Sequence, residues 1–270
     1  MPGLADIDRA TPTVEPAGAG GWPGLLDTAL LIAAVLALWQ AATLVLGAEA
    51  LASPLATVTR LAKIMADADF PLHAFETGRA FGTALIIALL GGLALGLALG
   101  AHRLSGQVAE PILVALYSIP KITLYPVILL LFGLGLSAKI AFGVIHGIIP
   151  VAIFTMNGVR NVRAIYFRAA RAMRLSGMQT AARIIVPAAV PEIVSGFRLG
   201  FSLTLLGTLI GEMFASQRGI GYLLVQAMEL NDIATVMALA LLLVVLATAA
   251  SSVLLAIDRR LHQRATPSGE

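Results

Sequence analysis

The chain has 270 residues, of which 59% are hydrophobic and only 12% are charged, and its mean hydropathy is +0.92. Such a composition leaves too few polar side chains to cover a soluble globular protein of this length, so we expect a lipid bilayer to surround much of the chain. The formal net charge of +3 comes without a basic tail and does not indicate nucleic-acid binding. Because the chain contains no cysteine, disulfides, thiolate metal sites and cysteine nucleophiles are excluded.

The apolar segments predict an all-α, polytopic membrane protein with about six transmembrane helices, since one helix crosses a bilayer with about 20 apolar residues. Residues 1–21 are rich in Pro, Gly and Ala and are expected to form a disordered cytoplasmic segment. Residues 22–260 are expected to form a single transmembrane domain, and residues 261–270 a cytoplasmic tail.

The first predicted span covers residues 25–46 and is followed by a short helix that lies on the membrane surface, with Pro54 in its first turn. The second predicted span, residues 80–101, has a face on which another helix backbone can approach closely. Three glycines at four-residue spacing form this face: Gly92, Gly96 and Gly100.

The third predicted span, residues 108–134, is interrupted by prolines on either side of Lys121 and Tyr125. Broken helices at membrane depth are tolerated where protein or a water-filled cavity surrounds them. Lys121 therefore lies either near a membrane interface or beside a transport path. The fourth span, residues 139–157, contains His146, which is either a packing residue or a proton relay.

The segment 158–187 carries six arginines and no acidic residue. By the positive-inside rule we expect it in the cytoplasm, between the fourth and fifth spans, with both chain termini on the same side. This arrangement places eleven basic residues in the cytoplasm and five on the opposite face. Those five are Arg60, Lys63, Arg79, Lys139 and Arg218.

The fifth predicted span covers residues 193–215 and the sixth covers residues 234–257, with a loop at 216–232 between them. Arg198, near the start of the fifth span, is expected at the level of the cytoplasmic headgroups, which its long side chain can reach. Glu212, near the end of that span, either lines a transport path or makes a polar contact with the loop that follows.

The arginines of segment 158–187 would lie on one side of a continuous helix, within an arc of about 140° at about 100° per residue. This basic face comprises Arg160, Arg163, Arg168, Arg171 and Arg174. It fits either anionic lipid headgroups or a soluble protein partner, and composition does not separate the two.

The sequence Arg168-Ala169-Ala170, followed by Ile184-Ile185-Val186-Pro187, resembles the EAA motif of ATP-binding-cassette (ABC) importer permeases. In that motif Glu-Ala-Ala is followed after three residues by Gly and after nine more by Ile-x-Leu-Pro, and the spacing here is the same. Three flanking blocks resemble permeases of the nitrate, sulfonate and taurine uptake group: SIPKITLYPVILLLFGLGLSAKI, PAAVPEIVSGFRLG and GEMFASQRGIGYLL. The resemblance covers about residues 50–260.

This resemblance implies a permease of the bacterial inner membrane that forms a translocation path for a small anionic solute. The implied partners are a second permease copy, two copies of a cytoplasmic ATP-binding subunit and a periplasmic solute-binding protein. ATP and Mg would bind to the ATPase, and this chain would hold no cofactor. The implied coupling residues are Arg168, Ala169, Ala170, Arg171, Arg174, Gly177, Ile184 and Pro187.

Two residues depart from the motif, because Arg168 stands in place of its Glu and Arg174 in place of its Gly. Gly at this turn permits a left-handed backbone that costs most other residues about 1–2 kcal/mol. We therefore expect the bend to have moved to Gly177. We also expect the partner ATPase to offer an acidic groove to Arg168, Arg171 and Arg174.

The sequence has no GxxxxGK[ST] loop for nucleotide phosphates and no Gly-x-Ser-x-Gly elbow, and its four histidines lack metal-ligand spacing. We therefore expect no catalytic residue, no metal site and no enzyme activity in this chain. The alternative is a secondary transporter coupled to an ion gradient. The candidate residues of the transport path are Lys121, Tyr125, His146 and Glu212.

Overall fold

The computed structural model describes residues 24–265. The predicted N-terminal segment 1–21 lies outside the described residues, as do residues 266–270 of the predicted tail. Helices account for nearly all of the described chain, which contains no strand, and the all-α prediction is confirmed. Contacts divide the chain into two compact units, Met1–Pro54 and Leu55–Glu270, which are described separately.

The first unit contains helix α1, Leu25–Leu46, whose bounds match the first predicted span. After the helix the chain turns at Gly47, which has a φ of +88°. The Trp39 indole Nε1 then donates a hydrogen bond of 2.9 Å to the Ala52 carbonyl. This bond ties the segment that follows α1 back onto the helix.

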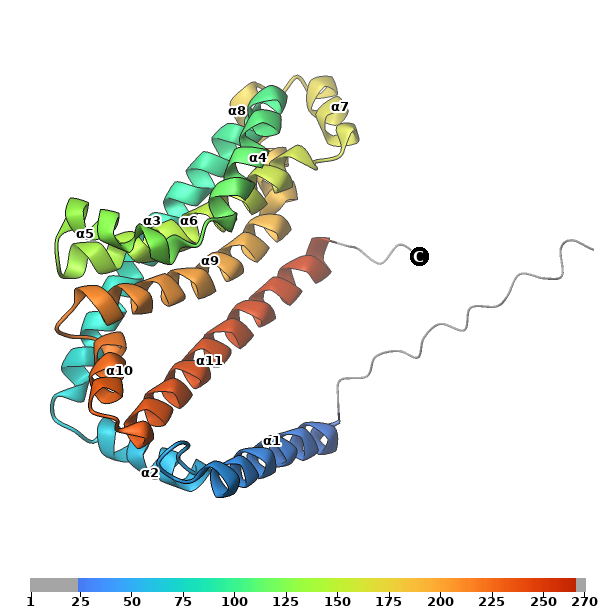
Figure 1. The fold of residues 1–270 in the computed structure, drawn as a ribbon. Coiled ribbons are helices and arrows are strands. Elements are labelled where there is room, and N and C mark those ends of the chain that lie inside the picture. Colours follow the sequence, from blue (N-terminus) through green and yellow to red (C-terminus); the bar gives the residue numbers. More distant parts are fainter. Residues whose placement is uncertain (1–23, 266–270) are drawn as a thin grey trace, which may run out of the picture. The chain divides into compact units, whose positions relative to one another are not determined.

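The second unit is a bundle of long helices with short helices at both ends (Figure 1). Helix α2, Pro54–Met65, is the short helix predicted after the first span, and it packs through Leu61 and Ile64 against residues of the last helices. Apart from the segment between α6 and α9, the others are α3 Phe70–Ala101, α4 Arg103–Ser118, η1 Lys121–Leu124, α5 Tyr125–Phe132, α6 Leu136–Arg160, α9 Val186–Ala215, α10 Ile220–Glu229 and α11 Ile233–Ala265.

The helices reproduce the predicted spans, and several of them are longer than predicted: α9 starts at Val186 rather than at residue 193. Helix α3 starts ten residues earlier than predicted, at Phe70, and α11 continues to Ala265, into the predicted tail. The predicted loop 216–232 contains helix α10, which follows a turn at Gly219. Five helices among the described residues are long and apolar enough to cross a membrane, and α4 with η1 and α5 forms a sixth, broken element bent by 84°.

Helix α6 is the centre of the bundle and makes its most extensive contacts with α3 and α9. The predicted glycine face of α3 is confirmed, because all three glycines are buried against α6. A Cβ atom added to Gly96 would overlap the Thr155 side chain and lie 2.7 Å from the Ala152 carbonyl oxygen. On the other side, a Cβ on Gly200 of α9 would lie 2.5 Å from the side chain of Val151.

We expect Gly96→Ala to lower the stability of the folded chain, because the added methyl group meets backbone and a β-branched side chain that cannot move away. Overpacking of this kind costs about 1–3 kcal/mol. Thermal unfolding of the purified chain in detergent measures the loss. Gly82→Ala is the matched control on the same helix, because no atom lies within 4 Å of the position that its new methyl group would take. Equal stability of the two variants would contradict the close approach of α3 and α6.

Candidate functional site

The arginine-rich segment between α6 and α9 forms two short helices joined by a turn. They are α7, Ala164–Ala172, and α8, Gly177–Thr180, and a π-helical turn, Ala181–Ile185, then leads into α9. Figure 1 shows α7 and α8 at the end of the second unit opposite to α10. We call these the α7 end and the α10 end of the bundle.

The turn after α7 is centred on Arg174, which has a φ of +51°. The Leu175 amide donates to the Ala170 carbonyl at 3.0 Å, and the Arg174 amide donates to the Arg171 carbonyl at 3.0 Å. This pair of bonds is the Schellman arrangement, in which the left-handed residue is usually glycine. Arg174 therefore has the left-handed backbone expected of the Gly that stands at this position in the motif that the segment resembles.

The expected shift of the bend to Gly177 is wrong. Gly177 is the first residue of α8, and its φ is not positive. Ser176 starts that helix, because its Oγ accepts a 3.3 Å hydrogen bond from the Gln179 amide while the Gln179 side chain accepts one of 2.9 Å from the Ser176 amide. This reciprocal cap fixes the start of α8 just after the turn.

The predicted continuous basic face is also wrong, because the helix breaks on both sides of α7. Helix α6 ends at Arg160, whose guanidinium donates a 2.6 Å hydrogen bond to Glu110 of α4. Arg168 and Arg171 remain on α7, three residues apart and therefore on one side of the helix. Both are exposed, as is Arg174, and none of the three forms an ion pair with another described residue.

The remaining predicted coupling residues lie along the same segment. Ala169 is exposed and Ala170 is buried on α7, so only one of the two alanines contacts the body of the protein. Ile184 lies in the π-helical turn and is half-buried. Pro187 lies in the first turn of α9, directly after the π-helical turn.

Glu212, near the end of α9, is completely buried in a polar cluster at the α10 end. Its carboxylate accepts hydrogen bonds from the Thr77 hydroxyl at 2.9 Å and from the Gly221 amide at 3.0 Å. The Thr77 oxygen in turn accepts a 2.8 Å hydrogen bond from the Ile220 amide. Of the two interpretations of Glu212, the structure favours the polar contact with the chain that follows α9.

Lys139 is the cation of this cluster and was not among the predicted site residues. Its ammonium lies 3.8 Å from the Glu212 carboxylate and donates a 2.8 Å hydrogen bond to the Arg218 carbonyl, and the side chain is almost fully buried. The sequence contained a usable signal, since Lys139 begins one predicted span and Glu212 ends the next. The two charges had to lie at the same membrane side.

The other candidate path residues lie near one another, on the side of Phe142 and Phe214. The Lys121 ammonium donates a 2.9 Å hydrogen bond to the Tyr117 carbonyl, and the Tyr125 hydroxyl donates one of 2.5 Å to the Phe214 carbonyl. His146 is buried, with its Nδ1 at 2.8 Å from the Phe142 carbonyl oxygen. That contact matches the interpretation of His146 as a satisfied packing residue.

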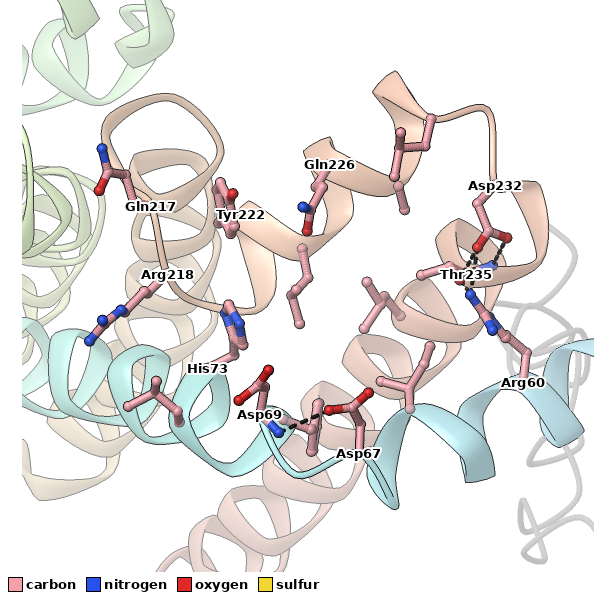
Figure 2. Close-up of a pocket in the computed structure, with 17 residues that line it drawn as sticks. Arg60, Asp67, Asp69, His73, Gln217, Arg218, Tyr222, Gln226, Asp232 and Thr235 are labelled. Atoms are coloured by element: carbon pink, nitrogen blue, oxygen red, sulfur yellow. Dashed lines mark hydrogen bonds and ion pairs between the residues drawn. The ribbon is translucent and has the colours of Figure 1, made fainter.

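A cavity of about 560 Å³ lies at the α10 end, between α2, the start of α3, α10 and the start of α11 (Figure 2). His73 forms part of its wall, where its Nδ1 accepts a 3.1 Å hydrogen bond from the Gly219 amide and its ring stacks on Tyr222. Asp67, Asp69 and Arg218 also line the cavity, so its wall carries charges of both signs.

An ion pair closes one side of this cavity. The Arg60 guanidinium donates a 2.6 Å hydrogen bond to Asp232 and another of 2.7 Å to the Thr235 hydroxyl. Burial acts to raise the pKa of Asp232, but hydrogen bonds from Thr235 and the charge of Arg60 together outweigh it and hold that pKa below its usual value. Asp232 is therefore a carboxylate at neutral pH. The pair links α2 to the start of α11.

We expect the Lys139 and Glu212 substitutions to be strongly coupled in a double-mutant cycle. Glu212→Gln leaves a buried ammonium without its counter-charge, and Lys139→Met leaves a buried carboxylate without its cation, so each single change should cost about 3–5 kcal/mol of stability. The double variant should lose less stability than the sum of the two single losses, by about 1 kcal/mol or more. Thermal unfolding measures the cycle. Lys63→Met with Glu212→Gln is the control cycle, because Lys63 is exposed, and additivity in both cycles would contradict the pair.

We expect Arg174→Gly to strengthen the turn after α7, because glycine adopts the left-handed conformation without the cost of about 1 kcal/mol or more that a side chain adds. Hydrogen exchange of the Arg174 and Leu175 amides, followed by mass spectrometry, should slow by about fivefold. Gly177→Ala should leave this exchange unchanged. Faster exchange in Gly177→Ala, with no effect of Arg174→Gly, would show that the bend is at Gly177 and not at Arg174.

Comparison with known proteins places this architecture in a family. Residues 88–265 match the model of the family described as "Binding-protein-dependent transport system inner membrane component". The chain is 26% identical over 240 residues to the putative aliphatic sulfonates transport permease protein SsuC of Bacillus subtilis, covering 88% of this chain and 87% of that protein. It is 29% identical over 178 residues to the taurine transport system permease protein TauC of Escherichia coli, covering 66% and 65% of the two chains.

Solved structures show the same fold. A chain of the MetNI methionine ABC transporter, in an inward-facing conformation, superposes with a TM-score of 0.60 at 23% identity, covering 69% of this chain and 93% of that chain. The matched family region includes α6, the α7–α8 segment and the α9–α11 helices. The chain therefore belongs to the family of inner-membrane components of binding-protein-dependent transport systems, the permeases of ABC transporters.

Proposed function

We propose that this chain is the membrane permease of an ABC importer that takes up a small anionic solute across the bacterial inner membrane. The observation that carries the proposal is the exposed α7–α8 segment, which has unpaired arginines and sits between α6 and α9 at one end of the bundle. Relatives named for sulfonate and taurine transport support the choice of an anionic solute.

The proposed orientation puts the α7 end in the cytoplasm, with both chain termini on the same side. The arginine excess of segment 158–187 supports this orientation. The α10 end, with its 560 Å³ cavity, then faces the periplasm, where a solute-binding protein delivers its cargo. A second copy of this chain completes the path, and two ATPase subunits, which bind ATP and Mg, supply the energy.

We call the α7–α8 segment, residues 164–180, the coupling segment. Its proposed role is to follow the motion of the ATPase. The turn at Arg174 and the cap at Ser176 hold α7 and α8 as two short helices with a defined angle, and α8 continues through the π-helical turn into α9. A push on this segment would therefore act directly on α9, which packs on α6 along most of its length. An acidic groove on the ATPase would match Arg168, Arg171 and Arg174.

Charge reversal on α7 tests the docking. We expect Arg168→Glu with Arg171→Glu to weaken co-purification of the ATPase at least tenfold, because repulsion replaces attraction to the acidic groove, and juxtaposed like charges at an interface cost several kcal/mol. ATP-dependent solute uptake by proteoliposomes containing the whole transporter should fall with it. Arg79→Glu is the control, because Arg79 is exposed on α3 and is placed on the periplasmic side.

In the reverse experiment, carboxylates of the ATPase are replaced by Lys or Arg and tested against the Arg168→Glu, Arg171→Glu variant. Restored binding would identify those carboxylates as the acidic groove. Unchanged co-purification of the double variant would contradict docking on α7. Uptake that runs on an ion gradient without the ATPase would instead support the secondary transporter, with Lys121, His146 or Glu212 as the groups to test.

A further inference from the structure

A second cavity, separate from the coupling segment and from the α10 end, lies between α9 and α11 beside Phe154 of α6, with a volume of about 520 Å³. Its polar lining consists of one guanidinium and five hydroxyl groups: Arg198, Ser195, Ser202, Thr248, Ser251 and Ser252. Among the apolar helices of this bundle, such a concentration of hydrogen-bond donors is unusual and requires an explanation.

The two helices contribute these groups from matching faces. Ser195 and Ser202 lie three residues before and four residues after Arg198, so all three occupy one face of α9. Ser251 and Ser252 follow Thr248 by three and four residues, so these three residues lie on one side of α11. The polar groups therefore form two facing sets across the cavity rather than a scatter of isolated hydroxyls.

Arg198 lies beside the inner part of α6. A Cβ on Gly196 would touch Phe154, and one on Gly200 would touch Val151, so Arg198 is level with this part of α6. These α6 residues lie three to six positions from the helix midpoint, or about 5–9 Å at 1.5 Å per residue. Arg198 lies within Gly177–Phe214, a stretch long and apolar enough to cross a membrane, and its expected place at headgroup level stays a prediction.

The guanidinium of Arg198 has no partner within the described part of the chain. Among the side chains that the structure describes, no carboxylate lies within ion-pair distance, and one side-chain hydrogen bond reaches this residue, the 3.4 Å bond from the Ser202 hydroxyl to its backbone carbonyl. An unpaired charge at membrane depth is costly, and residues of this kind face the interior or a water-filled cavity. The cavity thus holds a positive charge and hydroxyl donors, and no negative charge.

We propose that this cavity binds the anionic group of the transported solute inside the membrane. Arg198 would supply the counter-charge through the two parallel N–H groups of its planar fork, and the serine and threonine hydroxyls would donate to the remaining oxygens. Five hydroxyls around one guanidinium suit a compact oxyanion with several oxygen atoms, such as a sulfonate. The identification of this anion as cargo rests on the proposed importer function, whereas the binding site itself does not.

The site is tested by anion-dependent stability of the purified chain in nanodiscs of phosphatidylcholine, which is neutral overall. Sodium ethanesulfonate is titrated at ionic strength held constant with sodium chloride, and dimethyl sulfone serves as a neutral probe of similar shape. We expect ethanesulfonate to raise the unfolding temperature in a saturable way and dimethyl sulfone to have no such effect. Absence of a specific ethanesulfonate effect on the unsubstituted chain would overturn the proposal.

The variants locate the effect. Arg198→Gln should weaken the apparent affinity at least tenfold, about 1.4 kcal/mol, and Arg198→Lys should recover part of it because the charge is kept. Ser202→Ala and Ser252→Ala should each weaken it by about threefold, which provides a readout if Arg198→Gln does not fold. Arg79→Gln, at an exposed position on α3, should match the unsubstituted chain. Equal affinity of the Arg198 variants and the control would place the anion elsewhere.

A lipid phosphate offers the same chemistry, and the nanodisc composition distinguishes it. If added phosphatidylglycerol stabilises the chain through Arg198 while ethanesulfonate does not, the cavity is a lipid site and the solute proposal is overturned. The assay requires no ATPase and no binding protein. Anion binding without ATP-dependent uptake by the complete transporter would therefore contradict the importer function alone, and ATP-dependent uptake at an unchanged rate in Arg198→Gln would contradict this site alone.

Discussion

The close approach of α6 to both α3 and α9 is the constraint on which the rest of the structure depends. Lipid offers helices no hydrophobic driving force for association, so the stability of the bundle comes from packing at short distance, which small residues permit. The glycine face of α3 receives α6 on one side, and Gly200 and its neighbours on α9 receive it on the other. These two contacts fix the positions of the polar groups of α6 and α9 along the length of the bundle. They bring Lys139 of α6 beside Glu212 of α9 at one end, and they place Arg198 beside the same cavity as Phe154 of α6.

The buried polar groups differ in how they are satisfied, and this difference separates structural from functional roles. Glu212 has hydrogen-bond donors and a cation around it, and together with Thr77 it holds the start of α10 through two backbone amides. His146 is bonded to a carbonyl one turn away on its own helix. Such groups stabilise one arrangement of the chain. Arg198 has no partner of this kind among the described residues, and its cavity is lined by further donors, so its missing partner is expected to come from outside the chain.

Much of the fold could be predicted from hydropathy, glycine spacing and the placement of arginines, because these report directly on burial in a bilayer. The bounds of α1 and the packing face of α3 are examples. The turn at Arg174 could not be predicted, since the sequence offers a nearby glycine and the backbone instead keeps the motif's shape with an arginine. The prediction of a continuous basic face was wrong because it applied helical periodicity across the end of α6 and both ends of α7. Helix α10 and the grouping of hydroxyls around Arg198 depend on contacts between distant segments, which no local pattern contains. The pairing of Lys139 with Glu212 could have been found only by comparing the ends of two predicted spans.

The central claim is that this chain provides the path and obtains its energy from a separate ATPase. Uptake of radiolabelled ethanesulfonate or taurine by proteoliposomes tests it most directly, with the purified chain alone or together with its ATPase and its solute-binding protein. We expect uptake with the complete set and ATP inside the vesicles, and none with the chain alone under a proton or sodium gradient. Gradient-driven uptake by the chain alone would contradict the claim.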